Sequence, residues 1–330
     1  MNQVVAVPAG AINRNDDIRL FSGSANRPLA EAVAAELGIE LSAVNISKLP
    51  DGEIHVQISE LVRHQDIFII QPCSPNVNDM LVELMLLIDA FRRASAWRIN
   101  VIIPYFPYAR QDRMARGREA VSAKVVARTL EMLGVTRVMY VDIHALQIQG
   151  FFDLPVDPLT AMPVLAGYFQ DDPRFRPEET VIVAPDLGRA RLAGKYAEQL
   201  GMPLVIMNKS RLDFEHTTTA AVVGDIEDKT AIIIDDMIAG GSVLDQIPAL
   251  LAVGARSPVY LSITHPVLLP SALERLNRDY IAELVTTDTI YLPREKRHPK
   301  IRIQSIARTL AQAVYYIHSG ESVGSLLRLL

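Results

Sequence analysis

The feature that most constrains the fold is a repeated alternation of short β-branched runs with helical patterns. Such runs are typical of parallel strands that crossover helices bury on both faces. In the first half they are DIFIIQP (66–72), INVIIPYF (99–106) and VTRVMYVDIH (135–144). In the second half they are TVIVAPD (180–186), PLVIMNK (203–209), TAIIIDD (230–236) and PVYLSITHPV (258–267). The alternation predicts two α/β units in series, each with a mainly parallel sheet.

The helices expected between these strands carry apolar residues at three- and four-residue spacing. They span about 27–37, 78–96, 120–133, 189–200 and 243–253. The chain has 330 residues, of which 49% are hydrophobic, so it has enough apolar material for about two domains. A Pro/Asp-rich stretch at 171–180 is typical of a surface connection, and we place the domain boundary nearer residue 160.

Composition excludes several classes of protein. A net charge of -5 provides no broad cationic surface, so we expect no nucleic-acid partner. Cys73 is the only cysteine, which excludes an intrachain disulfide and a thiolate zinc cluster and suits a reducing cytoplasm. No apolar run approaches the ~20 residues that cross a bilayer. The N-terminus has no basic region before its short apolar run, so we expect a cytoplasmic protein without a signal peptide.

Polar residues follow the expected strands, and in open parallel sheets ligands gather beyond the carboxyl ends of the strands. The sharpest signal is IIIDDMIAGGSVL (232–244). There Asp235 and Asp236 can accept hydrogen bonds from sugar hydroxyls. Gly240 and Gly241 let the backbone approach an anion, and Ser242 can donate to a phosphate where a helix starts. The alternative is an ordinary strand-to-helix turn capped by the serine.

A second candidate site joins two strand ends that lie far apart in the sequence. His144 follows the expected strand 135–144, and Asp186 follows 180–186. An imidazole and a carboxylate can share Mg²⁺ with the oxygens of a triphosphate. The alternative for His144 is a hydrogen-bonded structural histidine.

Two cationic segments could bind phosphates. Arg110 and Gln111 lie in PYFPYARQDRMARGREAVSAK (104–124), where arginine can bind a polyphosphate and Gln111 can bind a base or a ribose hydroxyl. Lys209 and Arg211 begin a polar stretch that could close over a triphosphate as a lid. The alternatives are a solvated basic loop and an exposed hairpin loop.

Taken together, these segments resemble the ribose-phosphate diphosphokinases, also called PRPP synthetases. The resemblance runs from about Arg19 to the C-terminus and rests on the order and spacing of seven segments. They are LPDGEIHVQI (49–58), PYARQDR (107–113), DIHALQIQGFFD (142–153), APDLGRARLA (184–193), NKSR (208–211), IDD (234–236) and THPVL (264–268).

The resemblance implies two phosphoribosyltransferase-like α/β domains. The first, 1–160, would bind ATP and be completed by 310–330, and the second, 161–309, would bind ribose 5-phosphate. The family assembles through dimers, so we expect a homo-oligomer, a hexamer, with each ATP site at a subunit interface. The implied reaction is Mg²⁺-dependent transfer of the pyrophosphoryl group of ATP to the C1 hydroxyl of ribose 5-phosphate.

Roles for single residues also come from the resemblance. The ATP-binding positions are Asp51, Glu53, Arg110 and Gln111, and the metal-associated positions are His144 and Asp186. The catalytic cations are Lys209 and Arg211. The ribose-5-phosphate loop comprises Asp235, Asp236, Ala239, Gly240, Gly241 and Ser242.

Two other functions stay open on the sequence. Ala239 stands where the family usually has an acid, which allows a noncatalytic PRPP synthetase-like regulatory subunit. A phosphoribosyltransferase could use a similar acidic, glycine-containing loop, although it would leave the DGE and RQD segments unexplained.

Overall fold

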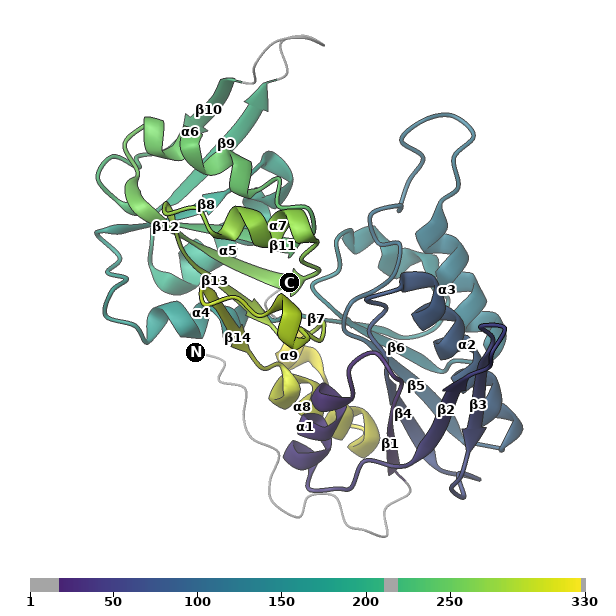
Figure 1. Cartoon of the computed structure of the whole chain (residues 1–330). Helices are drawn as coiled ribbons and strands as arrows, with labels where there is room; N and C mark the ends of the chain where they lie inside the picture. Colours follow the sequence, from purple (N-terminus) through teal and green to yellow (C-terminus); the bar gives the residue numbers. More distant parts are fainter. Residues whose placement is uncertain (1–17, 211–218, 328–330) are drawn as a thin grey trace. The chain divides into compact units, whose positions relative to one another are not determined.

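The structure is a computed structural model that describes residues 18–210 and 219–327, without the side chains of 208–210, 219–221 and 325. The chain divides into two compact units (Figure 1). Unit 1 holds the described residues up to Ala161, Thr289–Tyr291 and the described residues from Ser305 onward. Unit 2 holds Met162–Asp288 and Leu292–Gln304. The stretch 171–180 therefore connects two elements inside unit 2.

Unit 1 is built on a five-stranded parallel sheet in the order β1-β4-β5-β6-β7. Its strands are β1 (Ile18–Ser22), β4 (Asp66–Ile70), β5 (Arg98–Ile103), β6 (Arg137–Val141) and β7 (Val156–Leu159). A separate antiparallel hairpin comprises β2 (Val44–Lys48) and β3 (Ile54–Ile58). The helices are α1 (Arg27–Leu37), α2 (Val77–Arg93), α3 (Ser122–Leu133), the 3₁₀ turn η1 (Leu146–Phe151), α8 (Ala307–Ser319) and α9 (Gly324–Leu327).

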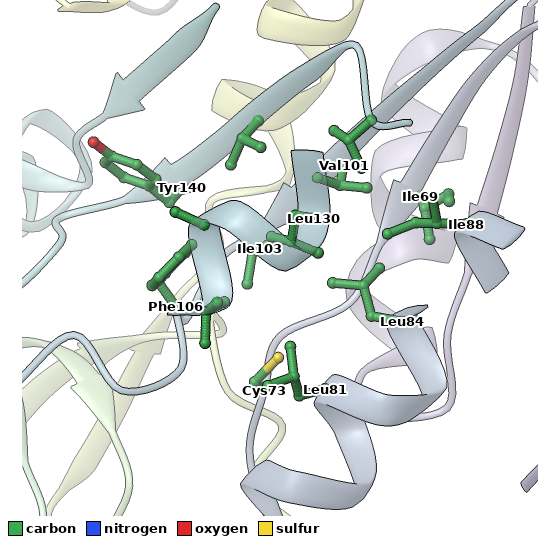
Figure 2. Close-up of a cluster of buried hydrophobic side chains, with 14 of the residues drawn as sticks. Ile69, Cys73, Leu81, Leu84, Ile88, Val101, Ile103, Phe106, Leu130 and Tyr140 are labelled. Atoms are coloured by element: carbon green, nitrogen blue, oxygen red, sulfur yellow. The ribbon is translucent and has the colours of Figure 1, made fainter. Parts of the chain in front are cut away.

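The core of unit 1 lies between the sheet and helices α2 and α3. Figure 2 shows side chains of β4, β5 and β6 packed with those of the two helices, and Cys73 lies among them. Burial raises the pKa of the Cys73 thiol, so this cysteine is a packing residue rather than a nucleophile.

Helix α8, near the C-terminus, packs within unit 1. It packs against α1, and Nδ1 of His318 lies 3.0 Å from a carboxylate oxygen of Asp66. Asp66 is fully buried at the start of β4, where it also pairs with Arg98 and accepts a hydrogen bond from Asn100 at 2.8 Å. A buried carboxylate requires such partners, so His318 of α8 helps to stabilise Asp66 in the first sheet.

Unit 2 is built on a seven-stranded sheet in the order β10-β9-β8-β11-β12-β13-β14. Its strands are β8 (Thr180–Ala184), β9 (Leu204–Ser210), β10 (Thr219–Val223), β11 (Thr230–Ile238), β12 (Arg256–Pro266), β13 (Ile281–Thr287) and β14 (Ile301–Gln304). Every neighbouring pair is parallel except β9 with β10. The helices are α4 (Met162–Gln170), η2 (Leu187–Arg189), α5 (Ala190–Leu200), η3 (Leu244–Gln246), α6 (Ile247–Ala252), α7 (Pro270–Leu276) and η4 (Arg294–Lys296).

Helices cover both faces of this sheet. Apolar residues of η3, α6 and α7 share one core cluster with alternate residues of β8 and β11, such as Val183 and Ile233. Helix α5 packs against β8, β9 and β11, and α4 packs against β12 to β14. Two mainly parallel sheets flanked by helices confirm the predicted fold class. Among the described residues, no helix is long and apolar enough to span a membrane.

Candidate active site

The acidic segment lies at the carboxyl end of β11, between β8 and β12 in the sheet of unit 2. Asp235 and Asp236 are still part of β11, and the loop follows at Ala239. The chain leaving β12 supports this loop, because the backbone N–H of Leu269 donates to the carbonyl of Ala239 at 3.0 Å. The loop is therefore held by its neighbour in the sheet.

Arg189 binds both carboxylates. Its Nε lies 3.0 Å from Oδ1 of Asp235, and its Nη2 lies 3.0 Å from Oδ1 of Asp236. The side chain of Asp236 is only 4% exposed. Burial, and then repulsion by Asp236, raises the pKa of Asp235 well above its usual range, while the charge of Arg189 opposes the rise. The guanidinium thus offsets part of the cost of burying two acids side by side.

The glycine turn is held against α7. Gly241 has φ +85°, and a Cβ built there would lie 3.1 Å from Cα of Ala272, so both the conformation and the space favour glycine. The carbonyl of Gly240 accepts hydrogen bonds from Oγ of Ser271 at 3.1 Å and from Arg275. These contacts fix the backbone next to the acidic pair.

Ser242 is exposed at the end of this turn. The helix expected at about 243–253 follows this serine, with the 3₁₀ turn η3 first and the α-helix α6 from Ile247. Pro248 lies in the first turn of α6, where a missing backbone N–H is tolerated. The turn therefore presents the exposed hydroxyl of Ser242 at the start of this helical stretch.

Asp186 belongs to the same group of residues. It is half-buried just after β8, where it caps η2, and its Oδ1 accepts a hydrogen bond from the backbone N–H of Arg189 at 3.0 Å. Arg189 therefore contacts Asp186 through its backbone and Asp235 and Asp236 through its side chain. The ends of β8 and β11 are joined through one residue that the sequence analysis did not single out.

In unit 1, Asp51 and Glu53 lie exposed in the turn between β2 and β3. The backbone N–H of Glu53 donates to Oδ1 of Asp51 at 3.2 Å. Lys48, at the end of β2, forms a 3.0 Å ion pair with Asp79 of α2. The hairpin thus presents two carboxylates to solvent.

The segments that contain Arg110 and His144 meet beyond the ends of β5 and β6. Arg110 and Gln111 are exposed, and Oε1 of Gln111 accepts a hydrogen bond from Oγ of Ser122 at 2.7 Å. His144 is half-buried. The side chain of Gln147 hydrogen-bonds to Asp112, so the structure joins the two segments at one edge of the first sheet.

The structure describes the remaining predicted site residues to different extents. His144 belongs to unit 1 and Asp186 to unit 2. Lys209 lies in β9, but its side chain and the whole of Arg211 lie outside the described residues. In 18–210 and 219–327, no three His, Cys, Asp or Glu side chains gather into a metal-binding group.

Three family models match successive parts of the chain. The N-terminal domain of ribose phosphate pyrophosphokinase matches 18–134, a phosphoribosyl transferase domain matches 164–263, and the phosphoribosyl synthetase-associated domain matches 215–328. A curated ribose-phosphate pyrophosphokinase from Staphylococcus aureus is 44% identical over 314 residues, which cover 95% of this chain and 98% of that protein. The chain belongs to the ribose-phosphate pyrophosphokinase family.

Two further proteins of this family are similar to nearly the whole chain. The protein of that name from Thermotoga maritima is also 44% identical, over 95% of this chain and 99% of its own length. The crystal structure of phosphoribosylpyrophosphate synthetase from Mycobacterium smegmatis matches with a TM-score of 0.85 and 38% identity, over 92% of this chain and 99% of that one. The similarity therefore includes both units and confirms the resemblance drawn from the sequence.

Proposed function

We propose that this chain carries out the reaction of its family at the carboxyl edge of the second sheet, with ribose 5-phosphate bound by the acidic loop. The product is phosphoribosyl pyrophosphate, the precursor for nucleotide biosynthesis, and AMP leaves. The observation that carries the proposal is that Asp235 and Asp236, directly before the tight turn at Gly241, both contact Arg189. Two acceptor carboxylates next to a small, close-packed turn suit a sugar that carries hydroxyls and one phosphate.

We propose a role for each part of the loop. Asp235 and Asp236 accept hydrogen bonds from the ribose hydroxyls. Gly240, Gly241 and the exposed Ser242 lie at the phosphate, with Ala239 between the two parts of the loop. Contact with Ser271 and Arg275 holds the Gly240 backbone in place before the sugar binds, which lowers the entropic cost of binding.

ATP binds at the surface formed by Asp51, Glu53, Arg110 and Gln111. A neighbouring subunit could complete this site, because Asp51 and Glu53 are exposed in the turn between β2 and β3. The assembly we propose is a homo-oligomer built from dimers, a hexamer, in the cytoplasm.

The reaction is an in-line displacement at phosphorus. The anomeric hydroxyl of ribose 5-phosphate loses its proton and its oxygen bonds to the β-phosphorus of ATP, while the bond from that phosphorus to the oxygen of AMP breaks. Lys209 and Arg211 neutralise the oxygens on which negative charge increases. Alignment and charge carry the catalysis, and no covalent enzyme intermediate is needed.

Magnesium fits the donors that this chain offers. Asp186 is a half-buried carboxylate at a strand end, and carboxylate and phosphate oxygens are the ligands that Mg²⁺ prefers. Asp186 would hold the ion together with oxygens of the triphosphate, whose charge the ion would neutralise, and His144 is the second metal-associated position that we propose. The protein residues orient these oxygens toward the sugar.

The test is incubation of the purified chain with ATP, ribose 5-phosphate and Mg²⁺, with products followed by ³¹P NMR. We expect AMP and phosphoribosyl pyrophosphate in equal amounts, and neither when EDTA is added or the sugar is omitted. Nucleotide binding without any AMP would favour the noncatalytic subunit instead. Release of pyrophosphate that depends on a nucleobase would favour a phosphoribosyltransferase.

A further inference from the structure

Arg189 lies between the ends of two neighbouring strands of unit 2, β8 and β11. It ends the 3₁₀ turn η2 directly before α5, and its side chain is only 17% exposed. From there it crosses from the end of β8 to the neighbouring end of β11, where it contacts Asp235 and Asp236, each at 3.0 Å. The residue thus links the element after one strand to the acids of the next.

The contacts define the relative position of the two carboxylates. Consecutive side chains of a strand normally point to opposite faces, yet here both reach the same guanidinium. The backbone N–H of Asp236 also donates to Oδ1 of Asp235 at 2.8 Å, which orients the first carboxylate toward the peptide group that follows it. Arginine suits this role because its planar group stays protonated and can bind two carboxylate oxygens through adjacent nitrogens.

We propose that Arg189 is a positioning residue, which holds Asp235 and Asp236 oriented so that both accept hydrogen bonds from the hydroxyls of the pentose. The inference rests on the proposed function of the acidic loop. Arg189 is a cation outside the acidic loop and outside the stretch after Lys209 that we predicted to close as a lid. Ala239, the next position after β11, has no polar side chain, so recognition of the hydroxyls depends on the two acids that Arg189 holds.

The main test is Arg189→Gln, with steady-state kinetics for each substrate. Without the guanidinium the two acids repel each other and take up protons or turn away. We expect the KM for ribose 5-phosphate to rise about 10- to 100-fold, the effect of losing a charge-assisted contact. The KM for ATP should change less than about threefold, because the loss is confined to sugar binding. Equal changes in both constants would contradict the positioning role.

Arg189→Lys separates charge from geometry. Lysine keeps the positive charge but cannot bind both carboxylates through a planar fork. We expect its KM for ribose 5-phosphate to lie between those of the original chain and of Arg189→Gln. If Arg189→Gln does not fold, as judged by thermal unfolding, the lysine variant alone decides, and an unchanged KM there would overturn the proposal.

The chain offers a matched control in the same unit. Arg256 also binds two acids, Asp228 at 2.8 Å and Glu179 at 3.2 Å, but it lies at the opposite, amino edge of the sheet and is 40% exposed. Because exposed pairs contribute little, Arg256→Gln should change the KM for ribose 5-phosphate less than about twofold. A rise equal to that of Arg189→Gln would mean that loss of any such pair weakens the sugar site.

A double-mutant cycle tests whether Arg189 acts through the acids. Asp235→Asn removes one of the acids that Arg189 contacts. The KM of the double variant Asp235→Asn, Arg189→Gln should therefore be raised by less than the product of the two single effects. Effects that multiply fully would show that Arg189 acts independently of Asp235 and would contradict the inference. A parent chain that forms no AMP at all would instead refute the proposed function, so the two failures are distinguishable.

Discussion

Lys209→Ala should lower kcat by about 10²- to 10³-fold, because the substitution removes a preorganised charge that acts on the transition state. Lys209 lies near the end of β9, which pairs with β8, the strand that Asp186 follows. In the proposed reaction its ammonium group stabilises the oxygens of the transferring pyrophosphoryl group. Single-turnover measurements with saturating ATP and ribose 5-phosphate would isolate this step from product release.

Lys229→Ala is the control for that result. Lys229 belongs to the same unit but precedes β11 at the amino edge of the sheet, where it pairs with Asp225 at 2.7 Å. We expect its removal to leave kcat within about twofold of the original value. If Lys209→Ala also retains near-normal turnover, Lys209 has no part in the mechanism.

The second large effect is expected for Asp236→Ala, which should raise the KM for ribose 5-phosphate about 10²-fold, because a charged acceptor of a ribose hydroxyl is lost. Asp236 is 4% exposed and paired with Arg189, so the substitution also removes one of the carboxylates that contact that guanidinium. Initial rates measured over a range of ribose 5-phosphate concentrations, at saturating ATP, give the value. Asp236→Asn keeps the size of the side chain, so its KM should lie between those of the original chain and of Asp236→Ala.

A matched acid at the other edge of the sheet is Asp228, which is 80% exposed and paired with Arg256. Asp228→Ala should leave the KM for ribose 5-phosphate unchanged. If the KM also stays unchanged in Asp236→Ala, the acidic loop does not bind the sugar, and the assignment of 235–242 must be abandoned.

Much of the fold could be predicted from the sequence because its central strands are continuous apolar runs. All seven predicted strands are present within a few residues, and the helix expected at 27–37 has those bounds. Asn26 caps its start, and Gly38, with φ +70°, ends it. The pattern of apolar runs did not predict β1, β2, β3, β7, β13 or β14. Each of these strands has polar residues among its apolar ones, so none is a continuous apolar run.

The candidate site was predicted less completely than the fold. The sequence indicated that site residues lie at the carboxyl ends of the strands. The structure brings Asp186, Asp235 and Asp236 together around Arg189. Arg189 itself was missed, because a cation three residues after an acid has many possible partners until strand order makes β8 and β11 neighbours. The basic residue within APDLGRARLA was the available signal. Similarly, the contact of Gln147 with Asp112 depends on the pairing of β5 with β6.

The most direct measurement follows the anomeric oxygen of the sugar. Ribose 5-phosphate labelled with ¹⁸O at C1 is converted with ATP and Mg²⁺, and the product is analysed by ³¹P NMR, with the label in unreacted sugar measured alongside. If the sugar hydroxyl attacks the β-phosphorus, the ¹⁸O remains as the bridge between C1 and the pyrophosphate, and AMP carries none. Loss of the label from that bridge would mean that the C1–O bond breaks, and would contradict pyrophosphoryl transfer to the sugar.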